Sequence, residues 1–290
     1  MNSATTHLRD LLDQEEPRFI RWMNRTWKTQ GALVDNAFVT NAIINGGLSA
    51  SQIDAWRAEY VEFINEHVGP AWQVMMEGGA DAAGSMYLGV DGAIIYNRHE
   101  QLFAQLMAER GGELIVNLTN QQAKAVNTIL KAVGVDGKLG VESTAKYIRA
   151  AVGLTEREAN AVAALRASLI ADGVPLAKVQ RAVLRQSSLY HRKRSLRIAR
   201  TELAQAYGNA LRSTMQAEVE LGNIAVESRE WNTADDELTC DVCRPLNNVK
   251  TTMASNYVSP ETGLEYSHPP AHIQCRCTEL YHTRSIIDGT

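Results

Sequence analysis

All four cysteines of this 290-residue sequence lie in one short stretch near its C-terminal end. They form the pairs Cys240-x-x-Cys243 and Cys275-x-Cys277, and His272 lies three residues before the second pair. Cysteine thiolates and histidine nitrogens at such spacings are the usual ligands of tetrahedral Zn²⁺. The sequence therefore predicts a zinc site. Because it offers five donors for four positions, the identity of the fourth ligand stays open.

Two other uses of the four thiols are disulfide bonds and unconnected free cysteines. The N-terminal residues up to Glu15 are polar and do not resemble a signal peptide, and a protein made in the cytosol keeps its thiols reduced. No cysteine precedes Cys240, which argues against four unrelated thiols. A catalytic zinc keeps one position open for water, whereas the surplus of donors here favours a closed, structural site.

The segment from Trp231 to His282 also needs an additional source of stability. It contains few large aliphatic side chains and many polar ones, so it buries too little apolar surface to offset the entropy lost on ordering. We expect a metal ion that joins the two ends of this segment to supply the missing stability.

The whole chain has the composition of an ordinary soluble globular protein, with 45% hydrophobic and 21% charged residues. Its formal net charge of −4 excludes a generally basic nucleic-acid coat protein but not a local basic patch. No apolar run reaches the roughly 18 residues of a membrane-spanning helix, so we expect none.

The hydrophobic pattern predicts helices over most of the chain. Apolar residues recur at helical spacing from Leu8 onward, and Pro17 is expected to break the first run. A later helix with an aromatic stripe, which we expect to be core, should end or kink near Gly69-Pro70. Three pairs resemble the capping boxes of helix starts: Ser49 with Gln52, Thr119 with Gln122, and Thr155 with Glu158.

Two further stretches have distinctive compositions. Five glycines lie between Gly78 and Gly92 without the pattern of a phosphate-binding loop, so we expect a flexible connection or hinge there. The longest helical tract runs from Leu176 to Leu221, which contains no proline and a single glycine. The residues from Ile224 to Trp231 then alternate loosely, as is typical of a strand.

Together these patterns predict a mainly α fold, with an N-terminal helical region and a helical bundle followed by a small zinc-stabilised α+β module at the C-terminal end. We place the N-terminal helical region, a candidate docking surface, at residues 1–110. The bundle with the long basic helix takes residues 111–222, and the zinc-knuckle module packed on that helix takes residues 223–290.

The long helix segregates its charges. Between Asp172 and Glu202 there is no acidic residue, but there are eight basic ones. A solvated helix face is the usual role of such a run, and the alternative is an anionic partner, either nucleic acid or an acidic protein surface. Beyond Tyr190 there is no interleaved aromatic residue, so stacking on bases is not supported. The candidate residues for an anionic partner are Arg192, Lys193, Arg194 and Arg197.

The C-terminal half carries a specific combination of features. In chain order they are Ile198-Ala199-Arg200-Thr201-Glu202, Ala206, Asn209, Trp231, Asp236, the first cysteine pair and Pro-Pro-Ala-His-Ile-Gln-Cys-Arg-Cys. This combination resembles the phage Mu F-like minor head proteins, a family of head morphogenesis proteins, over roughly Val141 to Tyr281. One departure is Leu246-Asn247-Asn248, where many members have a glycine. Asparagine tolerates the left-handed conformation that such a turn needs.

The resemblance implies a minor head protein of a tailed bacteriophage rather than an enzyme, and no catalytic residue is assigned. Such a protein associates with the portal and the procapsid during head morphogenesis. The expected partners are the portal protein and the major capsid or scaffold proteins, with packaged double-stranded DNA as a further candidate and no membrane. The expected location is the virion, inside the capsid near the portal, and the host cytoplasm during assembly.

Three residues are predicted to join the long helix to the C-terminal module: Arg200, Glu202 and Trp231. Arg200 is expected to pair with an acidic residue of the turn Asp235–Glu237. A catalytic pocket around Arg200 and Glu202 is the alternative, but no third acid or base group has an obvious place beside them.

Two enzymatic alternatives compete with the structural role. A zinc-stabilised nuclease of the HNH or treble-clef kind would use His268 or His272 to activate water, although no Asp-His or His-His pair precedes the cysteines. An ADP-ribosyltransferase-like domain would use Glu218-Val219-Glu220 as its E-x-E pair, but this segment lies in a predicted helix.

Overall fold

The computed structural model describes residues 3–134, 140–234 and 236–285. It divides into two compact units, each assembled from separate segments of the chain. Unit 1 comprises Met1–Arg18, Gly69–Ala108 and Arg197–Thr290, and unit 2 comprises Phe19–Val68 and Glu109–Leu196. The three domains expected from the sequence, with boundaries after residues 110 and 222, do not correspond to these two units, and that division stays a prediction.

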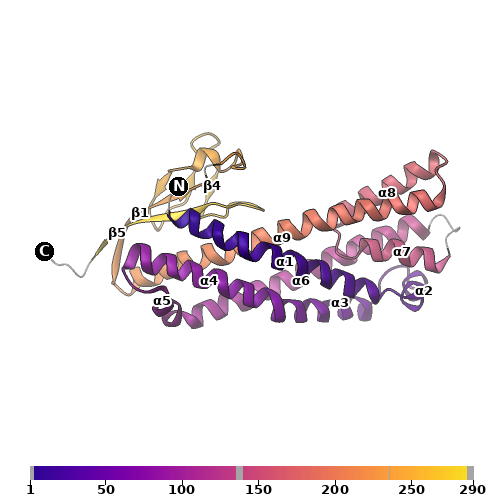
Figure 1. The fold of residues 1–290 in the computed structure, drawn as a ribbon, viewed down its shortest axis with the longest axis horizontal. Helices are drawn as coiled ribbons and strands as arrows, with labels where there is room; N and C mark the ends of the chain where they lie inside the picture. Colours follow the sequence, from indigo (N-terminus) through magenta and orange to yellow (C-terminus); the bar gives the residue numbers. More distant parts are fainter. Residues whose placement is uncertain (1–2, 135–139, 235, 286–290) are drawn as a thin grey trace. The chain divides into compact units, whose positions relative to one another are not determined.

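The protein is mainly α-helical with a small C-terminal sheet region, as predicted (Figure 1). Three long helices contribute residues to both units: α1 (Ser3–Ala32), α6 (Glu100–Gly134) and α9 (Leu176–Glu220). The other helices belong to one unit each: α4 (Gly69–Ala83) and α5 (Gly92–Arg98) to unit 1, and α2 (Asn36–Ile44), α3 (Ala50–Phe63), α7 (Val141–Ala151) and α8 (Glu156–Ala171) to unit 2.

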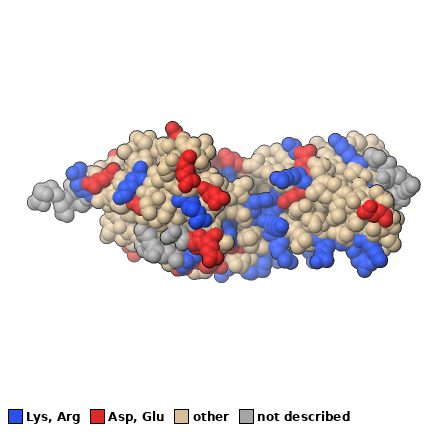
Figure 2. All heavy atoms as spheres, turned by 90° about the horizontal axis from the view of Figure 1, so that it is seen from above, with Lys and Arg blue, Asp and Glu red and all other residues tan. Residues whose placement is uncertain are grey.

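The described helices include none with the length and apolar character needed to cross a membrane. Acidic and basic side chains both occur on the face seen in Figure 2, and basic side chains gather in several places on it. The small net charge of the chain therefore reflects a mixture of the two signs rather than a shortage of charges.

The predicted starts of α3 and α8 are confirmed by reciprocal caps. The hydroxyl of Ser49 accepts the backbone N–H of Gln52, whose side chain accepts the N–H of Ser49 in return. Thr155 and Glu158 make the same pair of bonds at the start of α8. Each box satisfies two of the backbone donors that a helix start leaves open.

The third predicted box is wrong, because Thr119 and Gln122 lie buried inside α6. The side-chain oxygen of Gln122 accepts the Tyr60 hydroxyl at 2.8 Å and the backbone N–H of Gly153 at 2.9 Å. Trp27 donates its indole N–H to the same Tyr60 hydroxyl at 3.0 Å. Gln122 therefore satisfies buried donors of α3 and of the turn after α7 within unit 2 instead of starting a helix.

The prediction that Pro17 breaks the first helix is also wrong, because α1 runs through it without interruption. Proline removes one helical hydrogen bond and crowds the preceding turn. Apolar side chains are buried on both sides of it, among them Leu12 and Phe19. Their packing favours a continuous helix over the break that local propensity predicts. Near Gly69 the chain also stays helical, since a π-helical turn at Ile64–Val68 leads from α3 into α4.

The glycine-rich stretch after Gly78 is largely helical rather than a flexible connection or hinge. Helix α4 extends to Ala83, and a π-helical turn follows at Gly84–Leu88. A Cβ atom on the buried Gly79 would lie 2.5 Å from the carbonyl oxygen of Tyr207 in α9. The glycine therefore allows α4 to approach α9 closely within unit 1, and its role is packing.

The C-terminal part of unit 1 holds a three-stranded antiparallel sheet of order β2–β1–β5. The central strand β1 (Ile224–Asn232) confirms the predicted strand, and β2 (Lys250–Thr251) and β5 (Thr278–Ser285) flank it. A separate hairpin is formed by β3 (Tyr257–Val258) and β4 (Glu265–Tyr266).

We expect Gly79→Ala to destabilise unit 1, because the new methyl group would meet α9 backbone atoms, Tyr207 O at 2.5 Å and Leu211 N at 3.0 Å. Overpacking of this kind costs about 1–3 kcal/mol of unfolding free energy. Gly112→Ala is the matched control, because a Cβ there meets nothing within 4 Å and alanine is the better helix former by roughly 1 kcal/mol. Urea unfolding followed by circular dichroism measures both, and equal stability of the two variants would contradict the close approach of α4 and α9.

Candidate metal centre

The two cysteine pairs meet because β1 and β5 are antiparallel neighbours. In their register Asn232, the last residue of β1, lies opposite Thr278, the first residue of β5. The segment that follows β1 carries the first cysteine pair, and the loop that enters β5 carries the second. Both donor loops are therefore attached to the same end of the sheet.

A tight turn and an ion pair hold the two loops. The carbonyl oxygen of Cys240 accepts the backbone N–H groups of Cys243 at 3.1 Å and of Arg244 at 2.9 Å. Arg276 lies between the cysteines of the second pair and donates two hydrogen bonds to Asp236, at 2.6 and 2.8 Å. These bonds hold the pKa of Asp236 below its ordinary value and tie the second loop to the segment before the first pair.

The five predicted donor side chains converge between these loops. His272 Nε2 lies 3.0 Å from Cys240 Sγ and 3.1 Å from Cys243 Sγ, and Cys243 Sγ lies 3.7 Å from Cys275 Sγ. Cys277 forms a second group with Cys243 and Cys275, in which the sulfurs lie within 4.8 Å of one another. Zinc–sulfur bonds of about 2.3 Å place two sulfurs of a tetrahedral site roughly 3.8 Å apart. The Cys243–Cys275 separation matches the edge of such a site.

The orientation of His272 is set by its other ring nitrogen. His272 Nδ1 lies 2.8 Å from the carbonyl oxygen of Ile273, so in the neutral ring Nδ1 carries the proton and Nε2 presents its lone pair to the sulfurs. Metal-binding histidines are commonly oriented by an outer hydrogen bond of this kind. Hydrogen bonding to Cys275 raises the pKa of His272 to about 9. Binding of a metal ion therefore displaces a proton from Nε2.

The environments of the thiols shift their pKa values in opposite directions. Hydrogen bonds from Cys243 and Cys277 hold the pKa of Cys275 far below that of an ordinary thiol, whereas hydrogen bonding to Cys275 raises the pKa of Cys243. All four cysteines are free of disulfides, and only Cys240 is not fully buried. A buried thiolate beside an imidazole favours a cation, and the sulfur and nitrogen donors are those that Zn²⁺ prefers. The residues present therefore fit a zinc ion.

A compact apolar cluster backs the donors. Trp231, Leu246 and Tyr257 are fully buried together with three of the cysteines. The rings of Trp231 and Tyr257 meet edge to face, with centroids 5.1 Å apart and an interplanar angle of 86°. Trp231, predicted to join the long helix to the module, thus makes its ring contacts within the module.

The donor cluster is open to solvent on one side. A surface hollow of about 410 Å³ is lined by the donors and by Leu238, Ile273 and Gln274. Leu238 and Ile273 on its rim are 75% and 60% exposed. A metal ion can therefore reach the donors from solvent without unfolding of the module.

Arg200 has a different partner from the one expected. Its guanidinium donates to both carboxylate oxygens of Glu16 in α1, at 2.6 and 2.8 Å, and these bonds raise the pKa of Arg200. Within the turn Asp235–Glu237, Asp236 is bound to Arg276, and Asp235 lies outside the described residues. The partner Glu16 could not be predicted locally because α1, which covers this part of α9, is remote in sequence.

Helix α9 still contacts the second donor loop, through residues that flank Arg200. The backbone N–H of Gln274 donates to the hydroxyl of Thr201 at 3.0 Å. A Cβ on Gly208 would lie 3.2 Å from the carbonyl oxygen of Pro269. Glu202 is 4% exposed, so it belongs to the packed interior of unit 1.

Of the residues predicted to meet an anionic partner, Arg194 is not available. It is 2% exposed, donates to the carbonyl oxygen of Gly153 and to Gln121 at 2.6 Å, and lies over the ring of Trp27 at 5.5 Å. Arg192 and Lys193 are exposed, and Arg197 is half-buried.

The residues of the two enzymatic alternatives have structural partners. His268 Nδ1 lies 2.8 Å from the carbonyl oxygen of the next residue, and among the described residues His268 is not part of the donor cluster. Glu218, buried in α9, accepts from Arg98 at 2.7 Å, from His99 at 2.9 Å and from Asn223 at 2.5 Å. Burial alone would raise the pKa of Glu218, but these hydrogen bonds together hold it below its ordinary value.

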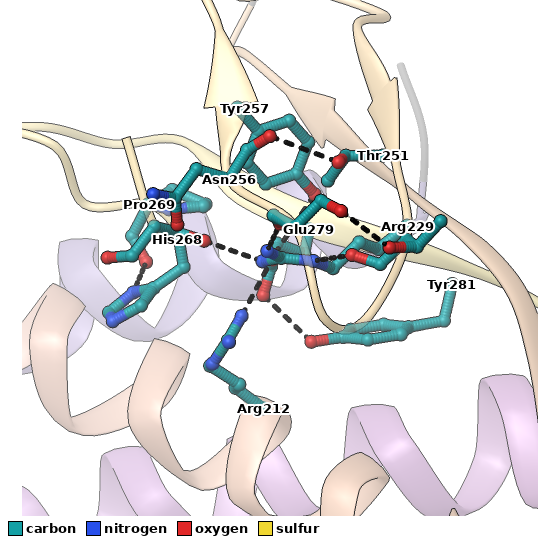
Figure 3. A network of polar contacts seen from close by, with 12 residues as sticks. Arg212, Arg229, Thr251, Asn256, Tyr257, His268, Pro269, Glu279 and Tyr281 are labelled. Atoms are coloured by element: carbon teal, nitrogen blue, oxygen red, sulfur yellow. Dashed lines mark hydrogen bonds and ion pairs between the residues drawn. The ribbon is translucent and has the colours of Figure 1, made fainter. Parts of the chain in front are cut away.

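Sequence reasoning missed a buried ionic network in the same module (Figure 3). Arg229 in β1 and Glu279 in β5 are 1% and 3% exposed, and their charged groups lie 2.6 Å apart. Tyr257 and Tyr281 donate their hydroxyls to the two oxygens of Glu279, at 3.0 and 2.7 Å. Arg212 of α9 lies 3.7 Å from the same carboxylate.

Arg229 also binds the backbone of the loops between β2 and β5. It donates to the carbonyl oxygens of Thr252 at 2.9 Å and Ser267 at 2.6 Å, and to that of Ser255. One side chain therefore fixes three points of a polar, irregular segment. The sequence held one signal for the burial of Arg229. It lies two residues before Trp231, so the two side chains lie on the same face of the strand.

Residues 160–280 match the model of a family described as Phage Mu protein F like protein. The match confirms the resemblance drawn from the sequence, over a segment that includes α9 and both cysteine pairs. No curated protein and no solved structure matches the chain.

We expect Glu279→Gln to destabilise the protein, because Arg229 then stays buried without its closest countercharge. Removing one partner of a buried pair costs about 3–5 kcal/mol. Glu230→Gln is the matched control on the neighbouring strand, since its carboxylate pairs with Lys250 and His282 nearer the surface and should cost below about 1 kcal/mol. Urea unfolding at neutral pH measures the difference, and losses of equal size would show that the network does not stabilise the fold.

Proposed function

Proceeding from the match of residues 160–280 to the Phage Mu F-like family, we propose that this protein is a minor head protein of a tailed bacteriophage. In this role it associates with the portal protein and the procapsid during head morphogenesis, and it contacts the packaged DNA. The family match is the observation that carries the proposal, because it spans the long helix and both halves of the metal centre.

The partners under this proposal are the portal protein and the major capsid or scaffold proteins. The place of action is the inside of the capsid near the portal, reached from the host cytoplasm during assembly. Exposed apolar side chains near α2 support a protein contact, since Leu33, Ile43 and Ile44 are 43%, 53% and 75% exposed within a short segment. This segment belongs to the N-terminal region expected to dock.

We further propose that the donor cluster holds Zn²⁺ in a structural role. Cys240, Cys243 and His272 supply three ligands, and one of Cys275 and Cys277 supplies the fourth. A site filled by protein ligands leaves no position for a reactive water, which is typical of structural zinc. The chemistry that the ion supplies is a cross-link between the loop after β1 and the loop before β5.

The proposed role is not enzymatic. Glu218 of the E-x-E pair is committed to Arg98, His99 and Asn223 on a helix. His268 lies outside the donor cluster among the described residues. The hydrogen bonds of Glu218 and the position of His268 support structural roles for the residues that the enzymatic alternatives would need.

Elemental analysis of the purified protein is expected to find about one zinc ion per chain, as in a four-ligand structural site. Cys240→Ser and Cys243→Ser should lose the metal and the protease resistance of the C-terminal module, because each removes a ligand. Cys275→Ser and Cys277→Ser form a matched pair, of which one should retain zinc and so identify the spare thiol. Zinc that is absent from the wild type, or fully retained in Cys240→Ser, would contradict the proposal.

Co-expression with the portal and capsid proteins of its own phage tests the head role. The protein should co-purify with procapsids that contain the portal and not with procapsids assembled without it. Replacing Ile43 and Ile44 by serine should weaken this association, whereas Ile94→Ser with Leu221→Ser, which removes apolar groups of similar exposure from unit 1, should not. If the wild type fails to enter portal-containing procapsids, the proposed role is wrong.

A further inference from the structure

The basic residues of α9 differ in how far the fold leaves them exposed. Arg194 is buried, and Arg200 is bound to Glu16. Four others are exposed at positions that share one helix face: Lys178, Arg181, Arg185 and Arg192. We call these four residues the basic stripe.

The basic stripe is a single continuous line. Its members stand three, seven and fourteen residues after Lys178, and the exposed Ser188 fills the gap at the tenth, so all five lie along one side of the helix. At a rise of 1.5 Å per residue, the line is about 21 Å long. It lies wholly within unit 2. No member forms an ion pair with any residue that the structure describes.

Such a line of like charges is unfavourable in the free protein. Neighbouring cations four residues apart on a helix repel by a few tenths of a kcal/mol. From Gly173 to Thr201 the helix and the turn before it contain no carboxylate that could neutralise them. An anionic partner that follows the line relieves this repulsion at each position.

The distribution of apolar residues favours a nucleic acid over a protein as that partner. Protein interfaces are apolar at the centre and charged at the rim. Here the order is reversed, because the cations and Ser188 occupy the centre while Leu184 and Leu189, each 41% exposed, lie to the sides. A duplex carries one charge per roughly 1.7 Å of axis, hence about twelve phosphates along the stripe. The stripe contains no aromatic side chain for stacking on single-stranded bases.

We propose that the basic stripe binds the phosphate backbone of duplex DNA without reading its sequence. The inference deepens the proposed head function, on which it rests only for the source of the DNA, the packaged genome. Of the four residues expected from the sequence it keeps Arg192, and it adds Lys178, Arg181 and Arg185, which the fold leaves exposed on the same helix face.

The test uses the full chain and a labelled duplex of about 30 base pairs, with binding followed by fluorescence anisotropy between about 50 and 200 mM salt. Four phosphate contacts predict a slope of about −3.6 for log K against log salt concentration, at about −0.9 per contact. Replacing the four stripe residues by glutamine, a good helix former, should remove most of this slope and weaken binding at least about tenfold at the lowest salt.

A matched control removes four other exposed cations of unit 2: Arg21, Lys124, Lys131 and Arg157, each replaced by glutamine. It has the same net charge as the stripe variant and should bind within about threefold of the wild type. Should the stripe variant not fold by circular dichroism, Arg181→Gln with Arg185→Gln is the smaller change, with an expected slope of about half.

Three results would overturn the proposal. The first is a wild type that does not bind the duplex, and the second is an equal loss of binding in the control variant. The third is displacement of the duplex by poly-L-glutamate at equal charge, which would identify an acidic protein surface as the partner. Co-purification with procapsids is measured separately, so failure of DNA binding and failure of the head role are distinguishable.

Discussion

The antiparallel pairing of β1 with β5 is the constraint on which the C-terminal module depends. It attaches the donor loop after Asn232 and the donor loop before Thr278 to one end of the sheet, so that side chains far apart in sequence become one ligand set. The same pairing puts Glu279 within 2.6 Å of Arg229. A slip of one residue would turn the side chains of one strand to the opposite face, and it would break both the ion pair and the ligand set.

This dependence explains which parts of the site could be predicted from the sequence. The metal donors were predictable because their chemistry is tied to residue type and spacing, which are visible locally. The pairing of Arg229 with Glu279 was not, because it depends on the register between two strands that are far apart in the sequence. The prediction of a flexible connection or hinge in the glycine-rich stretch was wrong for a similar reason. Nothing near Gly79 in the sequence shows that the backbone of α9 lies against it.

The charged residues of α9 were also only partly predictable from the sequence. Helical phase separates Arg192 from Arg194 by about 200° around the axis, and this much can be read from the sequence. Phase alone does not show which side is covered. That side is decided by Trp27 of α1 and by Gly153 in the turn after α7, both in unit 2, which bury Arg194. The long helix and the capping boxes of α3 and α8 were predictable. The function of each cation on the long helix could be assigned only from the packing.

The metal donor cluster and the ionic network around Arg229 stabilise different loops of the module, and both depend on strand β1. The donor cluster closes the segments around Cys240 and Cys275, whereas Arg229 holds the carbonyl groups of Thr252, Ser255 and Ser267. Buried ion pairs often add little stability over apolar residues of the same size. The contribution of Arg229 is therefore to fix a single arrangement of loops whose own apolar content is low. Because Arg229 and Trp231 share the buried face of β1, the ionic network, the small aromatic core and the metal donors all depend on the same strand.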